Sequence, residues 1–318
     1  VCTDATTDEN VWENIGGGRQ AVGKFHSQGS IAGFAAGATS IDRWTFTSST
    51  TTATNHASLS TGRVRSAGAS SRTHGYTLGG SNTASTVNYN RIDKFAFVSP
   101  DATATDVGDL SQTRRNQQGV TSVTHGYSCG GRTDAGMSDS NSLERVSFIS
   151  GGNATVTGSL NANIDHAVGF NSISHGYMAG GHPNIALIRK FSFFENSDST
   201  TVASLAIGRW SGGGHSTATH GFFSGGNTGA PNSSNITQID KFDYSSEATA
   251  TDHGDLPVAQ GYASGNTSTT HGYIFGSTST GTAPVRTIQR FSLSNGASSN
   301  DVGDLTTDHT LSANGQQH

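Results

Sequence analysis

A repeat of about 50 residues is the feature of this sequence that most constrains its fold. Its clearest element is a His-Gly-Tyr segment that runs into Gly-Gly, with small departures, and its histidines are 51, 50, 45 and 51 residues apart. The five copies begin at His74, His125, His175, His220 and His271. A degenerate copy at Ala32–Gly37 has alanine in place of histidine. Periods of roughly 20–50 residues are typical of solenoids, propellers and repeat arrays, so the chain reads as copies of one unit.

Three further landmarks keep the same order and nearly the same period. One is an aliphatic residue, often followed by an acid, then a base and usually an aromatic residue. The base is present in six of six copies: Arg43, Lys94, Arg145, Lys190, Lys241 and Arg290. A leucine then ends a Gly/Ser/Asp turn: Leu59, Leu110, Leu160, Leu205, Leu256 and Leu305. A glycine lies six residues before each histidine and recurs as Gly315. Landmarks that agree in order and spacing exclude coincidence.

Each unit has room for about four short strands, which is the content of a propeller blade. Apolar residues alternate along the third strand, as at Phe95 and Phe97. With 42 glycines and only 13% charged residues, the composition argues against helical bundles. The 15 Phe, 7 Tyr and 3 Trp argue against a disordered chain. The sequence contains no apolar run long enough to predict membrane insertion. Its net charge of −5 gives no reason to expect nucleic acid as a partner.

The repeat number predicts an all-β propeller of six four-stranded blades over residues 28–318, preceded by a linker or attachment segment over residues 1–27. The C-terminal segment Ala313–Gln316 supplies a strand that should pair with the strand Ile31–Gly37. This pairing closes the ring and removes an exposed strand edge. Seven blades are less favoured, because residues 1–27 are polar and contain three consecutive glycines.

An apolar strand that ends in Gly-Gly, at a period near 50, resembles the Kelch family of β-propellers. The later Tyr and Trp of the Kelch pattern are missing here. The combination of His-Gly-Tyr, Ile-Asp-Lys-Phe and Gly-Asp-Leu is more similar to Kelch-like repeats in structural proteins of marine bacteriophages, especially cyanophages. The repeat resemblance covers about residues 28–318.

That resemblance implies a non-enzymatic protein of the virion, of the tail, fibre or capsid-appendage type and extracellular on the particle. It implies other virion proteins and a host-surface glycan as partners, and a preceding domain could join copies into a homo-oligomer. Two alternatives stay open. One is a secreted or cell-surface bacterial propeller that binds carbohydrate, and the other is a propeller enzyme with an unrecognised site.

The five repeat histidines have two interpretations. They could form a ring of metal ligands or pH-sensing groups near the channel, or each could make a structural hydrogen bond that ties its blade to the next. Zinc requires ligands within about 2.1 Å of one ion, and equivalent residues of different blades are too far apart for this unless they line the axis. We therefore favour the structural role and expect no metal and no cofactor.

The six bases also have two interpretations, an anion-binding ring or pairs with acids and backbone carbonyls. Three of the four lysines in the chain lie at this position, which indicates a specific geometric demand. A buried base without a partner is unfavourable. We expect most of the six to contact an acid or a carbonyl oxygen.

No catalytic residue can be nominated, because an HExxH motif is absent and acids outside the repeated positions are few. We therefore expect no enzyme. The segments between second and third strands vary most: Ser81–Arg91, Arg132–Ser142, His182–Ala186, Asn227–Gln238 and Thr278–Thr287. Loops on a rigid scaffold commonly carry binding residues. Their larger features, Tyr89, His182 and Pro231, are the candidate binding residues.

Overall fold

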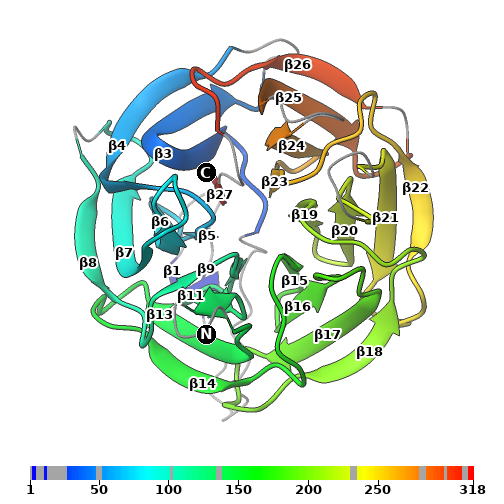
Figure 1. The fold of residues 1–318 in the computed structure, drawn as a ribbon, viewed down its shortest axis with the longest axis horizontal. Coiled ribbons are helices and arrows are strands. Elements are labelled where there is room, and N and C mark those ends of the chain that lie inside the picture. Colours follow the sequence, from blue (N-terminus) through cyan, green and yellow to red (C-terminus); the bar gives the residue numbers. More distant parts are fainter. Residues whose placement is uncertain are drawn as a thin grey trace.

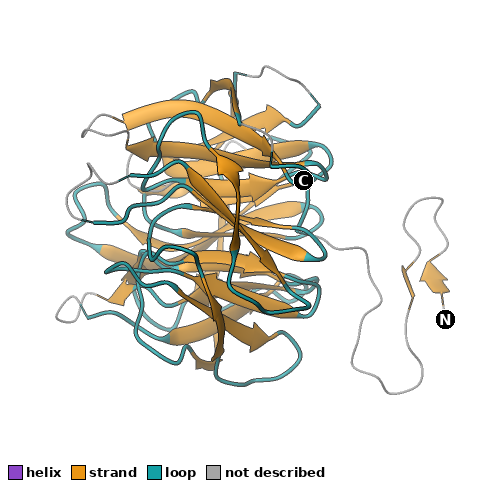
Figure 2. Ribbon diagram, turned by 90° about the vertical axis from the view of Figure 1, so that its right-hand side faces the viewer, coloured by secondary structure: helices purple, strands orange, loops and turns teal. Residues whose placement is uncertain are grey.

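The computed structural model describes residues 2–4, 11–12, 27–47, 52–100, 103–133, 138–229, 235–278, 284–296, 299–309 and 314–318. Within these residues the chain is all-β. Six antiparallel sheets are arranged as blades around a central axis (Figure 1). Seen from the side, the loops gather on two opposite faces of this ring (Figure 2). The predicted six-bladed propeller is confirmed.

The inner strand of each blade lies nearest the axis and the second strand pairs with it. The inner strands, from blade 1 to blade 6, are β27 (Asn314–Gln317), β5 (Ala67–Ser70), β10 (Gln118–Thr121), β15 (Val168–Asn171), β19 (Gly213–Ser216) and β23 (Ser264–Thr267). The second strands of blades 2 to 6 are β6 (His74–Ser81), β11 (His125–Cys129), β16 (His175–Ala179), β20 (His220–Ser224) and β24 (His271–Thr278).

The third strand carries the base of the repeat and the fourth lies at the rim. The third strands of blades 2 to 6 are β7 (Asn88–Ala96), β13 (Ser142–Ser147), β17 (Leu187–Ser192), β21 (Gln238–Asp243) and β25 (Pro284–Ser292). The outer strands are β4 (Thr54–Arg63), β8 (Thr105–Asp109), β14 (Thr155–Ser159), β18 (Thr200–Ser204), β22 (Thr251–Asp255) and β26 (Asn300–Asp304). Two small sheets pair β9 (Arg114–Arg115) with β12 (Arg132–Thr133), and β1 (Cys2–Asp4) with β2 (Val11–Trp12).

Blade 1 is built from both ends of the described ring. Its β3 (Ala32–Thr45) fills the second and third positions, because the chain reverses near Ala38, whose φ is 49°, and the Phe46 amide donates to the Ile31 carbonyl at 3.0 Å. The first half of β3 pairs with β27, with Gly315 opposite Ala35. The second half pairs with β4. The predicted closure by the two ends is therefore confirmed. The predicted boundary near residue 27 stays a prediction, since residues 13–26 lie outside the described part.

Six hydrophobic clusters fill the described ring, and each lies between two neighbouring blades. Between blades 1 and 2, for example, Phe34 stacks on Phe97 with ring centroids 4.8 Å apart. One blade cannot bury its apolar faces alone, so the repeat requires its neighbours. No helix capable of crossing a membrane is present in the described ranges.

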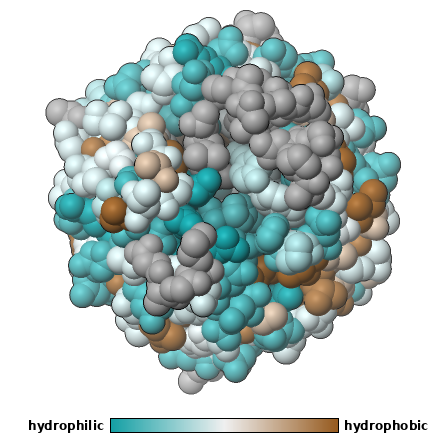
Figure 3. Space-filling model, in the orientation of Figure 1, coloured by the Kyte–Doolittle hydropathy of each residue, from teal (hydrophilic) through white to brown (hydrophobic). Residues whose placement is uncertain are grey.

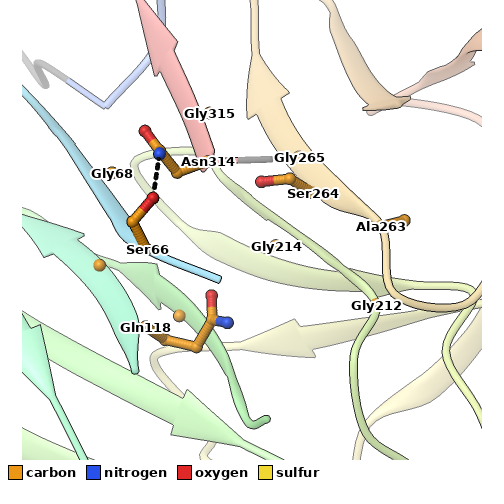
Figure 4. Close-up of a pocket in the computed structure, with 12 residues that line it drawn as sticks. Ser66, Gly68, Gln118, Gly212, Gly214, Ala263, Ser264, Gly265, Asn314 and Gly315 are labelled. Atoms are coloured by element: carbon orange, nitrogen blue, oxygen red, sulfur yellow. Dashed lines mark hydrogen bonds between the residues drawn. The ribbon is translucent and has the colours of Figure 1, made fainter. Parts of the chain in front are cut away.

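The repeat glycines explain how six inner strands fit around one axis. A Cβ atom on Gly119 would lie 1.8 Å from the carbonyl oxygen of Gly68, and one on Gly68 would lie 2.4 Å from that of Gly315. The same approach continues around the ring through Gly169, Gly214 and Gly265. These glycines line a cavity of about 50 Å³ on the axis (Figure 4), which has room for one or two water molecules.

Candidate ligand site at the channel mouth

The repeat histidines lie half-buried at the first residue of each second strand. Their Nδ1 atoms hydrogen-bond the hydroxyl of the preceding residue, at 2.8 Å for Thr73 and His74 and 2.8 Å for Ser174 and His175. The Ser71 hydroxyl also accepts a bond from the His74 amide, which fixes the turn. These bonds are local, so they differ from the expected tie between blades. In the described part, no group of three or more His, Cys, Asp or Glu side chains could hold a metal.

The six repeat bases occupy equivalent, half-buried places on the third strands. Lys190 forms an ion pair with Glu247 of the next blade. Arg145 and Arg290 hydrogen-bond the tyrosine directly opposite them, Tyr127 and Tyr273. Of the six, Lys190 is the one for which the described ion pairs include an acid. The expected acid pairing is therefore not general, because consecutive strand residues point to opposite faces and the preceding acid faces away from the base.

That preceding acid instead forms a buried contact that we call the seam, between one blade and the blade before it. Asp93 is 0% exposed and accepts bonds from the Ser60 amide (2.8 Å), the Ser60 hydroxyl (2.7 Å) and Arg63 (3.1 Å). Glu144 is bonded in the same way by Ser111 and Arg114. The seam between blades 2 and 3 thus repeats the seam between blades 1 and 2.

Sequence reasoning missed this seam, although the repeats carry its signal. In three of the four places where the following repeat has an acid, arginine stands four residues after the repeat leucine, at Arg63, Arg114 and Arg209. His309 fills that place opposite Asp42. Where the third strand has Arg189 the place holds Ile164, and where it has Gln289 it holds Gln260. The position four residues after the leucine and the position before the base change together from repeat to repeat, as expected for two side chains that face each other.

The chain enters the inner strands on the front face, the side toward the viewer in Figure 1, and the cavity on the axis lies beside the starts of these strands. We call this end of the axis the mouth. Each inner strand of blades 2 to 6 is preceded by a residue with φ between 54° and 59°. These are Arg65, Asn116, His166, Ser211 and Tyr262. Backbone hydrogen bonds link them around the mouth, from the Asn116 amide to Arg65 (2.9 Å) and from the His166 amide to Asn116 (3.0 Å). The backbone repeats here, whereas the side chain differs in every blade.

The side chains also differ between blades at two positions next to the positive-φ residue. The residue before the positive-φ position lies beside the residue that follows Gly-Gly on the neighbouring strand. Arg115 is the backbone register partner of Arg132 in the sheet of β9 and β12, and Trp210 forms a β-bridge with Asn227. We define the mouth cluster as the side chains that these positions bring together. Its members are Arg65, Arg115, Arg132, Asp165, His166, His182, Trp210 and Tyr262. The described surface in the middle of this face is mostly hydrophilic (Figure 3).

Asp165 is the anionic centre of the mouth cluster and is 1% exposed. Its Oδ2 atom lies 2.9 Å from His166 Nδ1 and 3.3 Å from an Arg132 nitrogen, and its Oδ1 atom lies 3.9 Å from His182 Nδ1. Burial alone would raise the Asp165 pKa. The His166 hydrogen bond and the nearby charges outweigh burial and hold the pKa below its usual range, so Asp165 is ionised at neutral pH.

Arg65 and Arg115 converge on Ser85 without a carboxylate of their own among the described ion pairs. Arg65 donates to the Ser85 hydroxyl, and Arg115 donates to the Ser85 carbonyl at 2.7 Å and to the Asn88 side-chain oxygen at 3.4 Å. The Nε atoms of both arginines are buried and have no hydrogen-bond partner among the described residues. Burial lowers the Arg65 pKa, as do the charges of Arg115 and Arg132. The cluster therefore holds an excess of buried positive charge.

Aromatic side chains make up the rest of the mouth cluster. Trp210 lies edge-on to Tyr262, with centroids 5.1 Å apart, and to His166 at 5.1 Å and His182 at 5.2 Å. Tyr262 is half-buried, so part of its ring reaches the surface. Cations, one buried anion, imidazoles and aromatic rings are thus combined at one mouth. Such a mixture is typical of ligand sites.

Of the three candidate binding residues, His182 belongs to the mouth cluster, and its side chain is 43% exposed. Tyr89 lies half-buried in β7, opposite Gly80. Pro231 lies outside the described residues. The other cluster members were missed, although a position that differs in every copy of a strict repeat is itself a signal of function.

A second hollow, of about 530 Å³, lies between blades 4 and 5 at the opposite ends of the inner strands. It brings two repeat histidines, His175 and His220, together with Lys190 and Tyr177. Its lining consists mostly of repeat positions. This hollow therefore contains fewer side chains that occur in one blade alone than the mouth does.

No protein-family model matches this chain, and no curated protein matches it. The structure defines its class as a six-bladed β-propeller.

Proposed function

We propose that this protein is a non-enzymatic recognition propeller whose mouth cluster binds a glycan on a host surface. The observation that supports this is the contrast between strictly repeated scaffold positions and eight non-repeated side chains gathered at one mouth. Nothing in the packing of a six-fold ring requires an arginine at one copy and a tyrosine at another. Rigid scaffolds commonly present variable binding residues in this way.

The chemistry of the mouth cluster favours a hydroxyl-rich ligand. Asp165 provides an acceptor, Arg132 and His182 provide donors, and Tyr262 provides a half-exposed aromatic ring. Sugars present hydroxyl groups on their edges and C–H groups on their faces, so polar groups beside an aromatic ring suit them. A protein partner that uses the same groups is the alternative within this function.

A binding array tests the glycan proposal. The purified chain is applied to immobilised neutral and acidic polysaccharides, beside Tyr262→Asn as the mouth variant and Lys241→Gln as a control on a third strand. Asparagine already occupies the equivalent positive-φ place as Asn116, so the variant should fold. We expect binding by the wild type and the control and its loss in Tyr262→Asn. An array without any binding, or binding that Tyr262→Asn leaves intact, would contradict the proposal.

We further propose that the propeller is part of a virion, exposed on a tail, fibre or capsid appendage and attached through its N-terminal segment to other virion proteins. The support is the resemblance of the repeat to Kelch-like repeats of marine bacteriophage structural proteins. Immunogold labelling of particles from the source material should decorate virions at one structure. Labelling of cell surfaces or medium alone would favour a secreted or cell-surface carbohydrate-binding propeller.

A second candidate function is an enzyme that acts at the same mouth. The observation that favours it is the pair of Asp165 and His166, since a carboxylate that holds an imidazole is a common acid–base arrangement. Turnover of any array glycan that is lost in His166→Asn, with binding kept, would support the enzyme. Binding without turnover supports the recognition module.

A further inference from the structure

Three arginines meet on one side of the mouth cluster, and the acids there do not balance them. Arg132 is paired with Asp139 (2.9 Å) and with Asp165 (3.3 Å). Arg65 and Arg115 contact only neutral oxygens among the described hydrogen bonds and ion pairs. Asp165 is also shared with His166 and His182. Among the described residues, two guanidinium groups therefore have no anionic partner.

Such an arrangement of positive charges is unfavourable for the stability of the fold. Arg115 is 7% exposed, and its buried Nε atom has no hydrogen-bond partner in the described part of the chain. Burying a charge without a counter-ion destabilises a fold, and like charges placed together add to this. Equivalent places in other blades hold Val64 and Gly261, so the fold does not demand arginine here. Residues that destabilise a structure without a structural reason commonly serve a ligand.

We propose that the mouth binds a glycan through a carboxylate group on the sugar, held by Arg65, Arg115 and Arg132. This proposal rests on the proposed function and specifies its substrate class as uronic-acid-type sugars. Planar guanidinium groups match a carboxylate with paired hydrogen bonds. The bound carboxylate supplies the missing counter-charge.

The remaining part of the cluster favours an acidic sugar over an acidic peptide. Trp210 contacts Tyr262 and His166, His166 is bonded to Asp165, and Asp165 also pairs with Arg132. The side chains of an acidic peptide such as polyglutamate offer carboxylates to the arginines but no hydroxyl group that could donate a hydrogen bond to ionised Asp165. A sugar presents one carboxylate to the arginines and hydroxyl groups to Asp165 and His182.

Calorimetry with three matched probes tests this inference. The probes are oligogalacturonate, its fully methyl-esterified form, and polyglutamate of similar length. We expect oligogalacturonate to bind, and binding to weaken as sodium chloride is raised. The methyl ester, which keeps the sugar and loses the charge, should bind more weakly by roughly tenfold or more, as expected for lost charge-assisted hydrogen bonds. Polyglutamate should not bind measurably.

Two arginine variants complete the test. Arg115→Gln keeps a donor for the Ser85 carbonyl but removes the charge, and Arg65→Asn places at this positive φ the residue found at Asn116. Either should reduce oligogalacturonate affinity by roughly tenfold. The control Arg286→Gln, at an exposed pair with Asp308, should leave it within about twofold.

The outcomes separate the inference from the proposed function. Equal binding of the ester and the acid would overturn the carboxylate site while leaving a glycan-binding mouth. Equal binding of polyglutamate would overturn the glycan and indicate an acidic peptide partner. Absence of binding to all three probes, with a negative polysaccharide array, would remove the proposed function itself.

Discussion

In blades 2 to 6 the glycine of the inner strand and the positive-φ position at the mouth lie three residues apart, yet they follow opposite rules. At the inner strands glycine recurs in all six blades, because the backbone of the neighbouring blade fills the space of a side chain. At the mouth the backbone conformation recurs, but the side chains are arginine, asparagine, histidine, serine and tyrosine. The comparison distinguishes residues that ring packing requires from residues whose side chains the packing does not restrict. The side chains that make this protein different from a generic ring lie at these unrestricted positions.

The largest expected effect comes from breaking the glycine ring. In Gly119→Ala the new Cβ would lie 1.8 Å from the Gly68 carbonyl oxygen, and backbone on both sides cannot move away. We expect the free energy of unfolding to fall by more than about 4 kcal/mol, as for the most severe core substitutions. Urea unfolding measures this loss.

The matched control is Gly151→Ala. A Cβ there meets nothing within 4 Å, and only the positive φ of 62° opposes it. That strain costs about 1 kcal/mol. Equal losses in the two variants would show that the close approach at the axis is not what fixes glycine.

The seam should give the next effect. Glu144→Gln removes the carboxylate from fully buried Arg114 and should lower the free energy of unfolding by about 3–5 kcal/mol. The double variant Glu144→Gln with Arg114→Gln recreates the Gln289 and Gln260 combination found between blades 5 and 6. It should regain most of the loss. A double variant as unstable as the sum of both single variants would show that the two positions are not coupled.

A pH effect sharpens the comparison at an inner strand. His215 is fully buried, and burial lowers its pKa from 6.5 to about 4, although the bond to the Asn266 carbonyl opposes the shift. The unfolded chain binds this proton below pH 6.5, whereas the folded chain binds it only below about pH 4. Stability from this residue is thus complete above pH 6.5 and is lost as the pH falls toward 4, by about 3 kcal/mol in all.

His215→Asn tests this dependence, because asparagine stands at the equivalent place in the next blade as Asn266. The difference in unfolding free energy between wild type and variant should change by about 3 kcal/mol between pH 7 and pH 4. Parallel pH profiles for the two proteins would contradict the assignment of this effect to His215.

The smallest expected effect is at the mouth. Tyr262→Asn keeps a residue suited to φ of 55° and removes a half-exposed ring. We expect the free energy of unfolding to change by about 1 kcal/mol or less, while glycan binding is lost. A loss as large as that of Glu144→Gln would place the mouth among the structural positions.

The repeat made the ring predictable, because strand content, blade number and closure at Gly315 all follow from its period. The base position was also found, but its partners were not, since the contact of Lys190 with Glu247 depends on how neighbouring blades pack. The seam could have been read from the joint change of Arg114 with Glu144 and Gln260 with Gln289.

The mouth cluster was harder to foresee. Its residues lie in three different parts of the unit, and only the ring geometry brings them to one place. His182 was found because it stands out in its loop, whereas Arg115 and Asp165 read as ordinary turn residues. Proximity across blades is not encoded in spacing along one repeat.

Arg114 and Arg115 test the central claim most directly, because they are neighbours in the chain and belong to different regions. Arg114 lies in the seam with Glu144, and Arg115 lies in the mouth cluster without a counter-ion among the described ion pairs. Equilibrium unfolding of Arg114→Gln and Arg115→Gln should show a loss of about 3–5 kcal/mol for the first. The second should stay within about 1 kcal/mol of the wild type or exceed it. Equal losses for the two variants would contradict the separation of scaffold from site.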